Sequence, residues 1–229
     1  MIALLDSDIF VYRVGSVSND DTEQHAKAKM DVFLNNLLTI QLPEVFEYEL
    51  YLTGKGNFRY KYAKTVPYKG NRKSEKPTHY NALRQHLQDK WDAQMVEGME
   101  ADDMLAIRQT ELEESMIVTL DKDLDQVEGW HYNFVKDEKY YTDKDLGDFL
   151  FFCQFLTGDR VDNIVGVKGI GKVKAKKLLE GLTESQMWDI VVHELGMERA
   201  IENGHLLYML RSRDDSFIKY LDRQGLKHG

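Results

Sequence analysis

The stretch from residue 93 to residue 120, AQMVEGMEADDMLAIRQTELEESMIVTL, carries the pattern that decides the fold. Its short apolar run at 93–98 predicts a strand, and residues 115–120 predict a second one. Between them, residues 100–114 place apolar side chains at helical spacing. A strand, a helix and a strand in this order are typical of a mostly parallel sheet that is covered by helices on both faces.

The same alternation extends over the first two thirds of the chain. Further strands are expected at 2–6, 46–52 and 130–135, with helices at 22–39 and 79–91. After about residue 145 the strand signals fade, and the remaining apolar patterns are helical. The predicted helices there span 144–156, 171–182, 184–195 and 199–210. We therefore expect an α/β domain at 1–145 and a helical region at 146–229.

Composition limits the classes of protein to consider. The chain has 229 residues, of which 42% are hydrophobic and 30% are charged, as in a globular protein. No apolar run is long enough to cross a bilayer, and the start MIALLDSDIF has no basic segment typical of a signal peptide. Cys153 is the only cysteine, which excludes an internal disulfide and a cysteine zinc site. These features fit a cytosolic protein.

Charge is segregated along the sequence. The net charge of −9 argues at first against a nucleic-acid partner. However, residues 55–76 hold eight Lys or Arg against Glu75 alone, and residues 166–179 hold five Lys and no acid. Two basic segments in an acidic chain predict phosphate contacts beside a carboxylate-rich centre.

Acidic residues follow the predicted strands at the points where those strands end. The four groups are Asp6; Glu100, Asp102 and Asp103; Asp121 and Asp123; and Asp159 and Asp162. The first three follow strands directly, and the fourth opens the loop before the lysine-rich segment. Because ligands gather at the carboxyl ends of strands in open α/β sheets, we expect these side chains to converge.

Each acidic group also has a structural interpretation. Acids in the first turn of a helix interact favourably with its dipole, and aspartates are common turn residues. Together, however, eight carboxylates at one edge would repel one another unless cations lie among them. Oxygen-only ligands suit Mg²⁺ or Mn²⁺, and two such ions are typical of phosphodiester hydrolysis.

The lysine-rich segment permits three interpretations. Gly166, Gly171 and Lys172 match the spacing of a nucleotide-binding P-loop, but Val173 replaces the required hydroxyl residue and no strand precedes the loop. The second interpretation is a glycine hairpin between helices, whose backbone N–H groups and lysines contact DNA phosphates. The third is a solvated lysine face on an amphipathic helix.

The other basic segment contains Lys69, Arg72 and Lys73. Such side chains stabilise negative charge that develops on a phosphoryl group. Tyr68 and Tyr12 are candidates for stacking on an unpaired base, although aromatic residues are more often part of a core.

These motifs together resemble the 5′-nuclease superfamily, which includes flap endonucleases, the 5′-nuclease domain of bacterial DNA polymerase I and small phage 5′–3′ exonucleases. The matching pieces occur in the family's order over residues 4–179: LLDSDIFVYR, GNFRY and YKGNR, EADD, DKDLDQ, and GDRVDNIVGVKGIGKVKAKKLL. The last piece is the most specific. The short chain and LTGKGNFR bring the sequence nearest to the phage exonucleases.

The resemblance implies a Rossmann-like (PIN/5′-nuclease) α/β core, an arch segment at 55–80 and a helix–three-turn–helix element. It assigns Asp6, Glu100, Asp102 and Asp103 to a first Mg²⁺ or Mn²⁺ ion. It assigns Asp121, Asp123, Asp159 and Asp162 to a second. Lys69 and Arg72 fall on residues that contact the scissile phosphate. The implied DNA-binding residues are Lys69, Arg72, Lys73, Gly169, Gly171, Lys172 and Lys174, and relatives hold a K⁺ ion at the glycine hairpin.

The resemblance further implies a monomeric 5′–3′ exonuclease acting on DNA with a 5′ end or flap, or on an RNA–DNA hybrid. It would work in the cytoplasm of a bacterial cell, or of the host if the protein is phage-encoded. Two positions depart from the family pattern. Thr53 stands where many relatives carry Asp, so we expect weaker binding of the first ion, and Val165 replaces a proline. Asp8 and Asp125 are additional acids outside the ligand set.

Two alternatives stay open from the sequence. A non-catalytic protein that binds branched DNA would keep the same fold and basic segments. A single-strand ribonuclease is disfavoured, because it would leave the lysine-rich hairpin without a duplex to bind.

Overall fold

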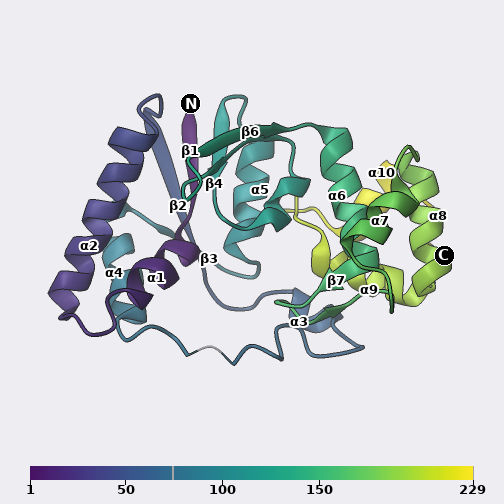
Figure 1. The fold of residues 1–229 in the computed structure, drawn as a ribbon, viewed down its shortest axis with the longest axis horizontal. Coiled ribbons are helices and arrows are strands. Elements are labelled where there is room, and N and C mark those ends of the chain that lie inside the picture. Colours follow the sequence, from purple (N-terminus) through teal and green to yellow (C-terminus); the bar gives the residue numbers. More distant parts are fainter. Residues whose placement is uncertain (74, 229) are drawn as a thin grey trace. The chain divides into compact units, whose positions relative to one another are not determined.

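The computed structural model describes residues 1–73 and 75–228, which form two compact units (Figure 1). The first unit contains residues 1–57, 75–124 and 129–141, and the second contains residues 58–73, 125–128 and 142–228. Each unit is therefore assembled from separate parts of the chain. The basic arch segment contributes residues 58–73 to the second unit. The division into 1–145 and 146–229 stays a prediction.

The first unit is built on a mostly parallel sheet. Among the described residues its six strands lie in the order β3-β2-β1-β4-β5-β6. They span Ile2–Asp6 (β1), Glu47–Thr53 (β2), Gln94–Val96 (β3), Ser115–Val118 (β4), Gly129–Asn133 (β5) and Glu138–Thr142 (β6). β1 pairs in parallel with β2 and β4, which aligns Asp6 with Tyr51 and Leu5 with Val118. The parallel α/β fold expected from the sequence is confirmed.

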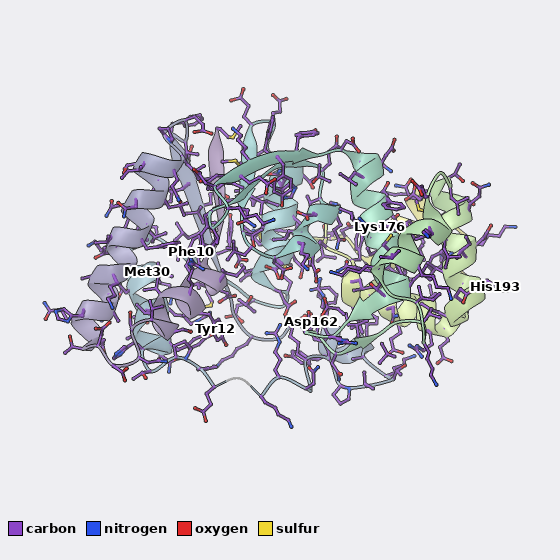
Figure 2. The ribbon with its side chains drawn as sticks, viewed as in Figure 1. Phe10, Tyr12, Met30, Asp162, Lys176 and His193 are labelled. Atoms are coloured by element: carbon purple, nitrogen blue, oxygen red, sulfur yellow. The ribbon has the colours of Figure 1, made fainter. Side chains whose placement is uncertain are left out.

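Helices cover both faces of this sheet. Alternating strand residues such as Ala3 and Leu5 point into a core shared with three helices, which span Ser7–Ser16 (α1), Glu23–Asn36 (α2) and Tyr80–Trp91 (α4). Phe10 of α1 and Met30 of α2 lie in that core (Figure 2). The helix Ala101–Glu111 (α5) packs on β1, β2 and β4 from the other side (Figure 1).

The first unit also has elements that were not expected from the sequence. The helix α1 was not predicted. The helix α2 continues into a π-helical turn at Leu37–Gln41. The strand β6, with the sequence EKYYT, was not predicted, because its charged and aromatic residues do not alternate clearly.

The second unit is mainly helical, as predicted. Its helices span Arg59–Tyr62 (α3), Lys144–Thr157 (α6), Lys172–Leu179 (α7), Glu184–Leu195 (α8), Met197–Leu207 (α9) and Phe217–Arg223 (α10). The helices α3 and α10 were not predicted. Aromatic rings form much of the core. The ring centroids of Phe151 and Phe155 of α6 lie 5.0 Å apart, and that of Trp188 of α8 lies 6.0 Å from the centroid of Phe155. No helix of the described residues is long and apolar enough to span a membrane.

A two-stranded ribbon follows α6 in the segment that was expected to be a loop. Gly158–Asp159 (β7) pairs antiparallel with Ile164–Val165 (β8). Gly158 has a φ of +66°, and a Cβ atom there would lie 2.3 Å from the carbonyl oxygen of Ile164. Gly166 is equally crowded, with 2.4 Å between an added Cβ and the backbone nitrogen of Gly158. Only glycine permits this close approach of the two backbones.

Candidate functional site

Asp6 lies at the carboxyl end of β1 and is 2% exposed. Its Oδ2 accepts a 2.7 Å hydrogen bond from the Thr119 hydroxyl, and its Oδ1 accepts a long 3.4 Å bond from the backbone N–H of Ile9 at the start of α1. Burial, together with the charges of Asp8 and Asp121, raises the pKa of Asp6 to about 7, although the hydrogen bond from Thr119 acts in the opposite direction. Asp6 is thus a buried carboxylate close to other negative charges.

The acidic trio at residues 100–103 forms the start of α5. Glu100 is the N-cap residue, and it forms a capping box with Asp103 in which each side chain accepts a hydrogen bond from the other's backbone N–H. Both side chains are buried, with 6% of Glu100 and 0% of Asp103 exposed. The structural interpretation of these two acids is therefore correct. It does not exclude a ligand role, since a carboxylate has lone pairs for several partners.

Asp121 and Asp123 follow β4 in a tight turn that leads into a 3₁₀ helix at Lys122–Gln126. The backbone N–H of Asp121 donates to Thr119 Oγ1 at 3.0 Å, and that of Asp123 donates to Asp121 Oδ1 at 2.9 Å. The Thr119 hydroxyl thereby connects this turn with Asp6. The carboxyl ends of β1 and β4 are joined as the parallel pairing requires.

Asp8 and Arg84 form an ion pair that sequence reasoning did not identify. Asp8 Oδ1 lies 2.5 Å from Arg84 Nη1, and the two side chains are 24% and 12% exposed. Asp8 is one residue past the start of α1, and its charge raises the pKa of Asp6. Asp8 was placed outside the ligand set, and Arg84 on α4 carried no recognisable signal in the sequence.

The donor chemistry of the first unit fits a divalent cation, but the side chains do not yet enclose one. In the part of the chain that the structure describes, no three His, Cys, Asp or Glu side chains are grouped so as to hold a metal ion. Glu100, Asp103 and Asp8 instead form hydrogen bonds within the unit. Carboxylates close to one another also repel unless a cation lies between them.

Asp162 in the second unit is surrounded by residues of the arch segment (Figure 2). Its Oδ2 accepts a 2.7 Å hydrogen bond from the Tyr68 hydroxyl, and its Oδ1 lies 2.7 Å from Arg72 Nη2. Lys69 Nζ lies 3.6 Å from Oδ2, and the Lys69 backbone N–H donates to the Asp162 carbonyl at 2.9 Å. Asp162 thus positions the side chains of Lys69 and Arg72, which were predicted to contact the scissile phosphate.

Asp159 shapes the loop that presents Asp162. Its Oδ1 accepts hydrogen bonds from the backbone N–H groups of Val161, at 2.6 Å, and of Asp162, at 3.0 Å. The neighbouring Asn163 donates to the carbonyl of Pro67 at 2.8 Å. The acidic loop and the arch segment are therefore fastened together within this unit by side-chain and backbone bonds.

Known structures share this arrangement of elements. No protein-family model and no curated protein sequence matches the chain. Among solved structures, a zinc-bound bacteriophage T5 5′-exonuclease is 17% identical, covers 90% of this chain and 88% of its own, and has a TM-score of 0.63. A bacteriophage T5 flap endonuclease solved with DNA and metal ions is 14% identical, with 97% coverage of both chains and a TM-score of 0.60. The catalytic core of Rad2 in complex with a DNA substrate is 15% identical over 94% of this chain and 78% of its own, with a TM-score of 0.56.

The chain has the 5′-nuclease fold. The fold implied by the sequence motifs is thereby confirmed. At these identities the similarity concerns the fold, and the roles of individual residues stay predictions.

Within the 5′-nuclease fold, the glycine hairpin leads directly into α7. Gly169 has a φ of +82°, which favours glycine, and Gly171 is the N-cap residue of α7. An added Cβ at either glycine would meet open space, so neither is required by local packing. Lys172 and Lys174 are exposed, as are Lys168 and Lys73. The hairpin is thus accessible and positively charged, as a phosphate-binding segment would be.

Three other residues of the predicted motifs take part in internal contacts, as the core interpretation of the two tyrosines anticipates. Tyr68 is 3% exposed and bonds Asp162, so its ring does not provide a surface for stacking on a base. Tyr12 is 37% exposed but packs on Tyr80 with the ring centroids 5.5 Å apart (Figure 2). Arg59, counted in the basic segment, is 1% exposed and donates to the carbonyls of Leu206 and Tyr208. It anchors the arch segment to the end of α9.

Proposed function

We propose that this protein is a metal-dependent 5′–3′ exonuclease that hydrolyses phosphodiester bonds from the 5′ end of duplex DNA. Cleavage of 5′ flaps or of RNA primers belongs to the same proposal. The observation that carries it is the set of carboxylates that follow β1, β3 and β4 in one unit of the 5′-nuclease fold. Asp6, buried there beside the charges of Asp8 and Asp121, makes binding of a cation favourable, since a cation would offset this repulsion.

Two Mg²⁺ or Mn²⁺ ions fit this donor set. Asp6, Glu100, Asp102 and Asp103 would hold the first, and Asp121 and Asp123 of the same unit would take part in holding the second. When bound, such ions lower the pKa of water and stabilise charge on the leaving oxygen. A K⁺ ion at the glycine hairpin is a further part of the proposal.

Basic side chains of the protein would orient the substrate. Lys69 and Arg72, held by Asp162, would bind the scissile phosphate and stabilise negative charge on it. Lys73, Gly169, Gly171, Lys172 and Lys174 would contact the backbone of the duplex, independently of base sequence. Since Asp162 already holds Lys69 and Arg72 before substrate binds, these two side chains would need little reorganisation at the moment of reaction.

We also propose that the protein acts as a monomer in the cytoplasm of a bacterial cell, or of a phage-infected host. The competing function is a DNA-structure-binding protein without catalysis. It predicts tight binding to branched DNA, with no product that depends on a divalent metal.

The deciding experiment uses three 5′-labelled substrates: a blunt duplex, a duplex with a 5′ flap, and an RNA–DNA hybrid. Each is incubated with the protein and Mg²⁺, and the products are sized. Mononucleotides would indicate exonuclease activity, whole flaps would indicate endonuclease activity, and binding without product would favour the non-catalytic alternative.

Variants connect the activity to the proposed residues. Asp102→Asn and Asp121→Asn each preserve size while removing a charge, and each is expected to abolish Mg²⁺-dependent cleavage. Asp92→Asn is the matched control, because Asp92 is an exposed acid at the end of α4 in a left-handed conformation that asparagine accepts. Cleavage that persists unchanged in both site variants would refute the mechanism.

A further inference from the structure

Thr53 ends β2 and uses all three of its hydrogen-bonding groups inside the first unit. Its backbone N–H donates to Asp8 Oδ2 at 2.8 Å, and its carbonyl accepts from Arg84 Nη2 at 2.5 Å. Its hydroxyl oxygen accepts a 2.9 Å hydrogen bond from the backbone N–H of Ala101. Thr53 thus connects α1, α4 and α5 at the end of one strand.

The first two contacts fix the backbone of Thr53. Asp8 and Arg84 bond to each other as well as to Thr53, which closes a ring of three hydrogen-bonded residues. The guanidinium of Arg84 also lies over the ring of Tyr80, 5.4 Å from its centroid. A partly buried pair with this many fixed contacts restricts movement of the end of β2 more than an exposed ion pair would.

The third contact acts on α5. The first N–H groups of a helix have no carbonyl partner within the helix, and Ala101 provides the first of them in α5. The capping box satisfies the N–H of Asp103, and the Thr53 hydroxyl satisfies that of Ala101. The helical turn that carries Glu100, Asp102 and Asp103 is thereby bonded to the end of β2.

We propose that Thr53 is a positioning residue for the divalent-cation site, acting through its hydroxyl bond to Ala101 rather than as an anionic ligand. This inference rests on the proposed function. Through this bond the hydroxyl fixes the position of the first turn of α5 along and around the helix axis. It therefore also fixes the directions of the carboxylates in that turn. Asp8 and Arg84 bond the backbone of Thr53 and so hold the residue that carries the hydroxyl.

The test replaces Thr53 by residues that separate shape from hydrogen bonding. Thr53→Val keeps the branched shape and removes the acceptor, whereas Thr53→Ser keeps the hydroxyl. Loss of an interaction that orients metal ligands typically lowers metal affinity about 10–100-fold. We expect Mn²⁺ affinity, measured by calorimetric titration of the full chain, to fall by at least about 10-fold in Thr53→Val and to be restored in Thr53→Ser.

A second measurement needs no metal. Amide hydrogen exchange in the metal-free protein should be faster at Ala101 in Thr53→Val than in the original protein and in Thr53→Ser. Thr22→Val is the matched control, because Thr22 caps α2 with a 3.3 Å bond from the His25 N–H. It removes a helix-capping hydroxyl elsewhere, so it should lower stability without changing Mn²⁺ affinity.

A further pair of variants separates the effect of charge from that of hydrogen bonding. Thr53→Asn and Thr53→Asp both offer an oxygen acceptor, but only Asp adds a negative charge. Under the proposal, Thr53→Asn binds Mn²⁺ within a few-fold of the original protein. If Thr53→Asn instead binds as weakly as Thr53→Val, the acceptor has no positioning role.

The outcomes distinguish this inference from the proposed function. If Thr53→Val binds Mn²⁺ as tightly as the original protein, the positioning role is wrong and the metal site stands. If the original protein binds no Mn²⁺, the proposed function and the positioning role fail together. Faster exchange at Ala101 in Thr53→Val would then assign the hydroxyl to stability alone.

Discussion

The phenolic hydroxyl of Tyr68 donates a 2.7 Å hydrogen bond to Asp162, a residue 94 positions later in the chain. The same carboxylate pairs with Arg72 and lies near Lys69, so Tyr68 sets the position of the acid that holds both cations. Because Tyr68 is 3% exposed, water does not readily replace its hydroxyl. This relationship predicts an effect on activity from a residue that is not expected to contact the substrate.

Tyr68→Phe should lower the free energy of unfolding by about 1 kcal/mol, the usual net value of one hydrogen bond. It should lower the cleavage rate by about 10-fold or more, since misplaced catalytic cations stabilise the developing charge poorly. Denaturant unfolding and single-turnover cleavage measure the two effects. Tyr60→Phe is the control, because Tyr60 packs edge-on against Tyr68 and is 58% exposed. Equal rates in both variants would contradict a positioning role for the hydroxyl.

Asp6→Asn should stabilise the metal-free protein at pH 8. The folded-state pKa of Asp6 is raised from 3.8 to about 7, so the folded protein at pH 8 contains a buried charge that burial disfavours. This destabilisation is absent at pH values below the pKa of Asp6 in the unfolded chain. It is complete at pH values above the pKa of Asp6 in the folded protein. It amounts to at most about 4 kcal/mol, since one pKa unit corresponds to about 1.4 kcal/mol.

Thermal unfolding of both proteins with chelator and with Mg²⁺ tests this prediction. The melting temperature of the original protein should rise with Mg²⁺, whereas that of Asp6→Asn should be higher with chelator and respond less to Mg²⁺. A variant that is less stable than the original protein under chelator would show that the Asp6 charge is already compensated within the chain.

Replacing Lys172 and Lys174 together by alanine should weaken DNA binding without changing sequence preference. Each lysine that neutralises a phosphate contributes about 0.9 to the slope of log affinity against log salt for duplex DNA. The double variant should therefore bind more weakly at low salt and show a shallower slope. Titration of a labelled duplex at several salt concentrations measures both. An unchanged slope would favour the alternative of a solvated lysine face.

His205 should make the protein less stable as the pH falls from neutral. It is 7% exposed and stacks on Tyr62 at 3.7 Å, and burial lowers its pKa to about 4. The unfolded chain therefore binds a proton near pH 6.5 that the folded chain does not bind until about pH 4. Stability is lost as the pH falls through this window, by up to about 3 kcal/mol.

His205→Phe removes the titrating ring but keeps an aromatic partner for Tyr62. Its free energy of unfolding should vary less between pH 7 and pH 4 than that of the original protein, as measured by denaturant unfolding at several pH values. His193→Gln is the control, because the side chain of His193 is 83% exposed (Figure 2). Parallel pH profiles for His205→Phe and the original protein would contradict the assignment.

The secondary structure could be predicted where one periodicity dominates a segment. The strands β1, β2 and β4 and the helices α4, α6 and α8 lie within about two residues of the predicted ranges, because their apolar residues recur at strand or helix spacing. The helix α5 ends three residues before its predicted end. The helices α1, α3 and α10 were missed, and so were the strand β6 and the ribbon of β7 and β8. The pairing of these strands depends on neighbouring strands and on the close contact of Gly158 with Gly166, not on a pattern within each segment.

The amino-acid sequence by itself determined which residue types follow each strand, and parallel strands bring their carboxyl ends to one edge of a sheet. That was sufficient to predict that Asp6, Glu100 and Asp121 converge, and this stays a prediction. Only the tertiary structure decided which carboxylates are already bonded within the chain. Thr53 forms hydrogen bonds with Asp8, which lies 45 positions earlier in the chain, and with Ala101, which lies 48 positions later. Local periodicity carries no information about such partners, because they are chosen by the packing of separate elements.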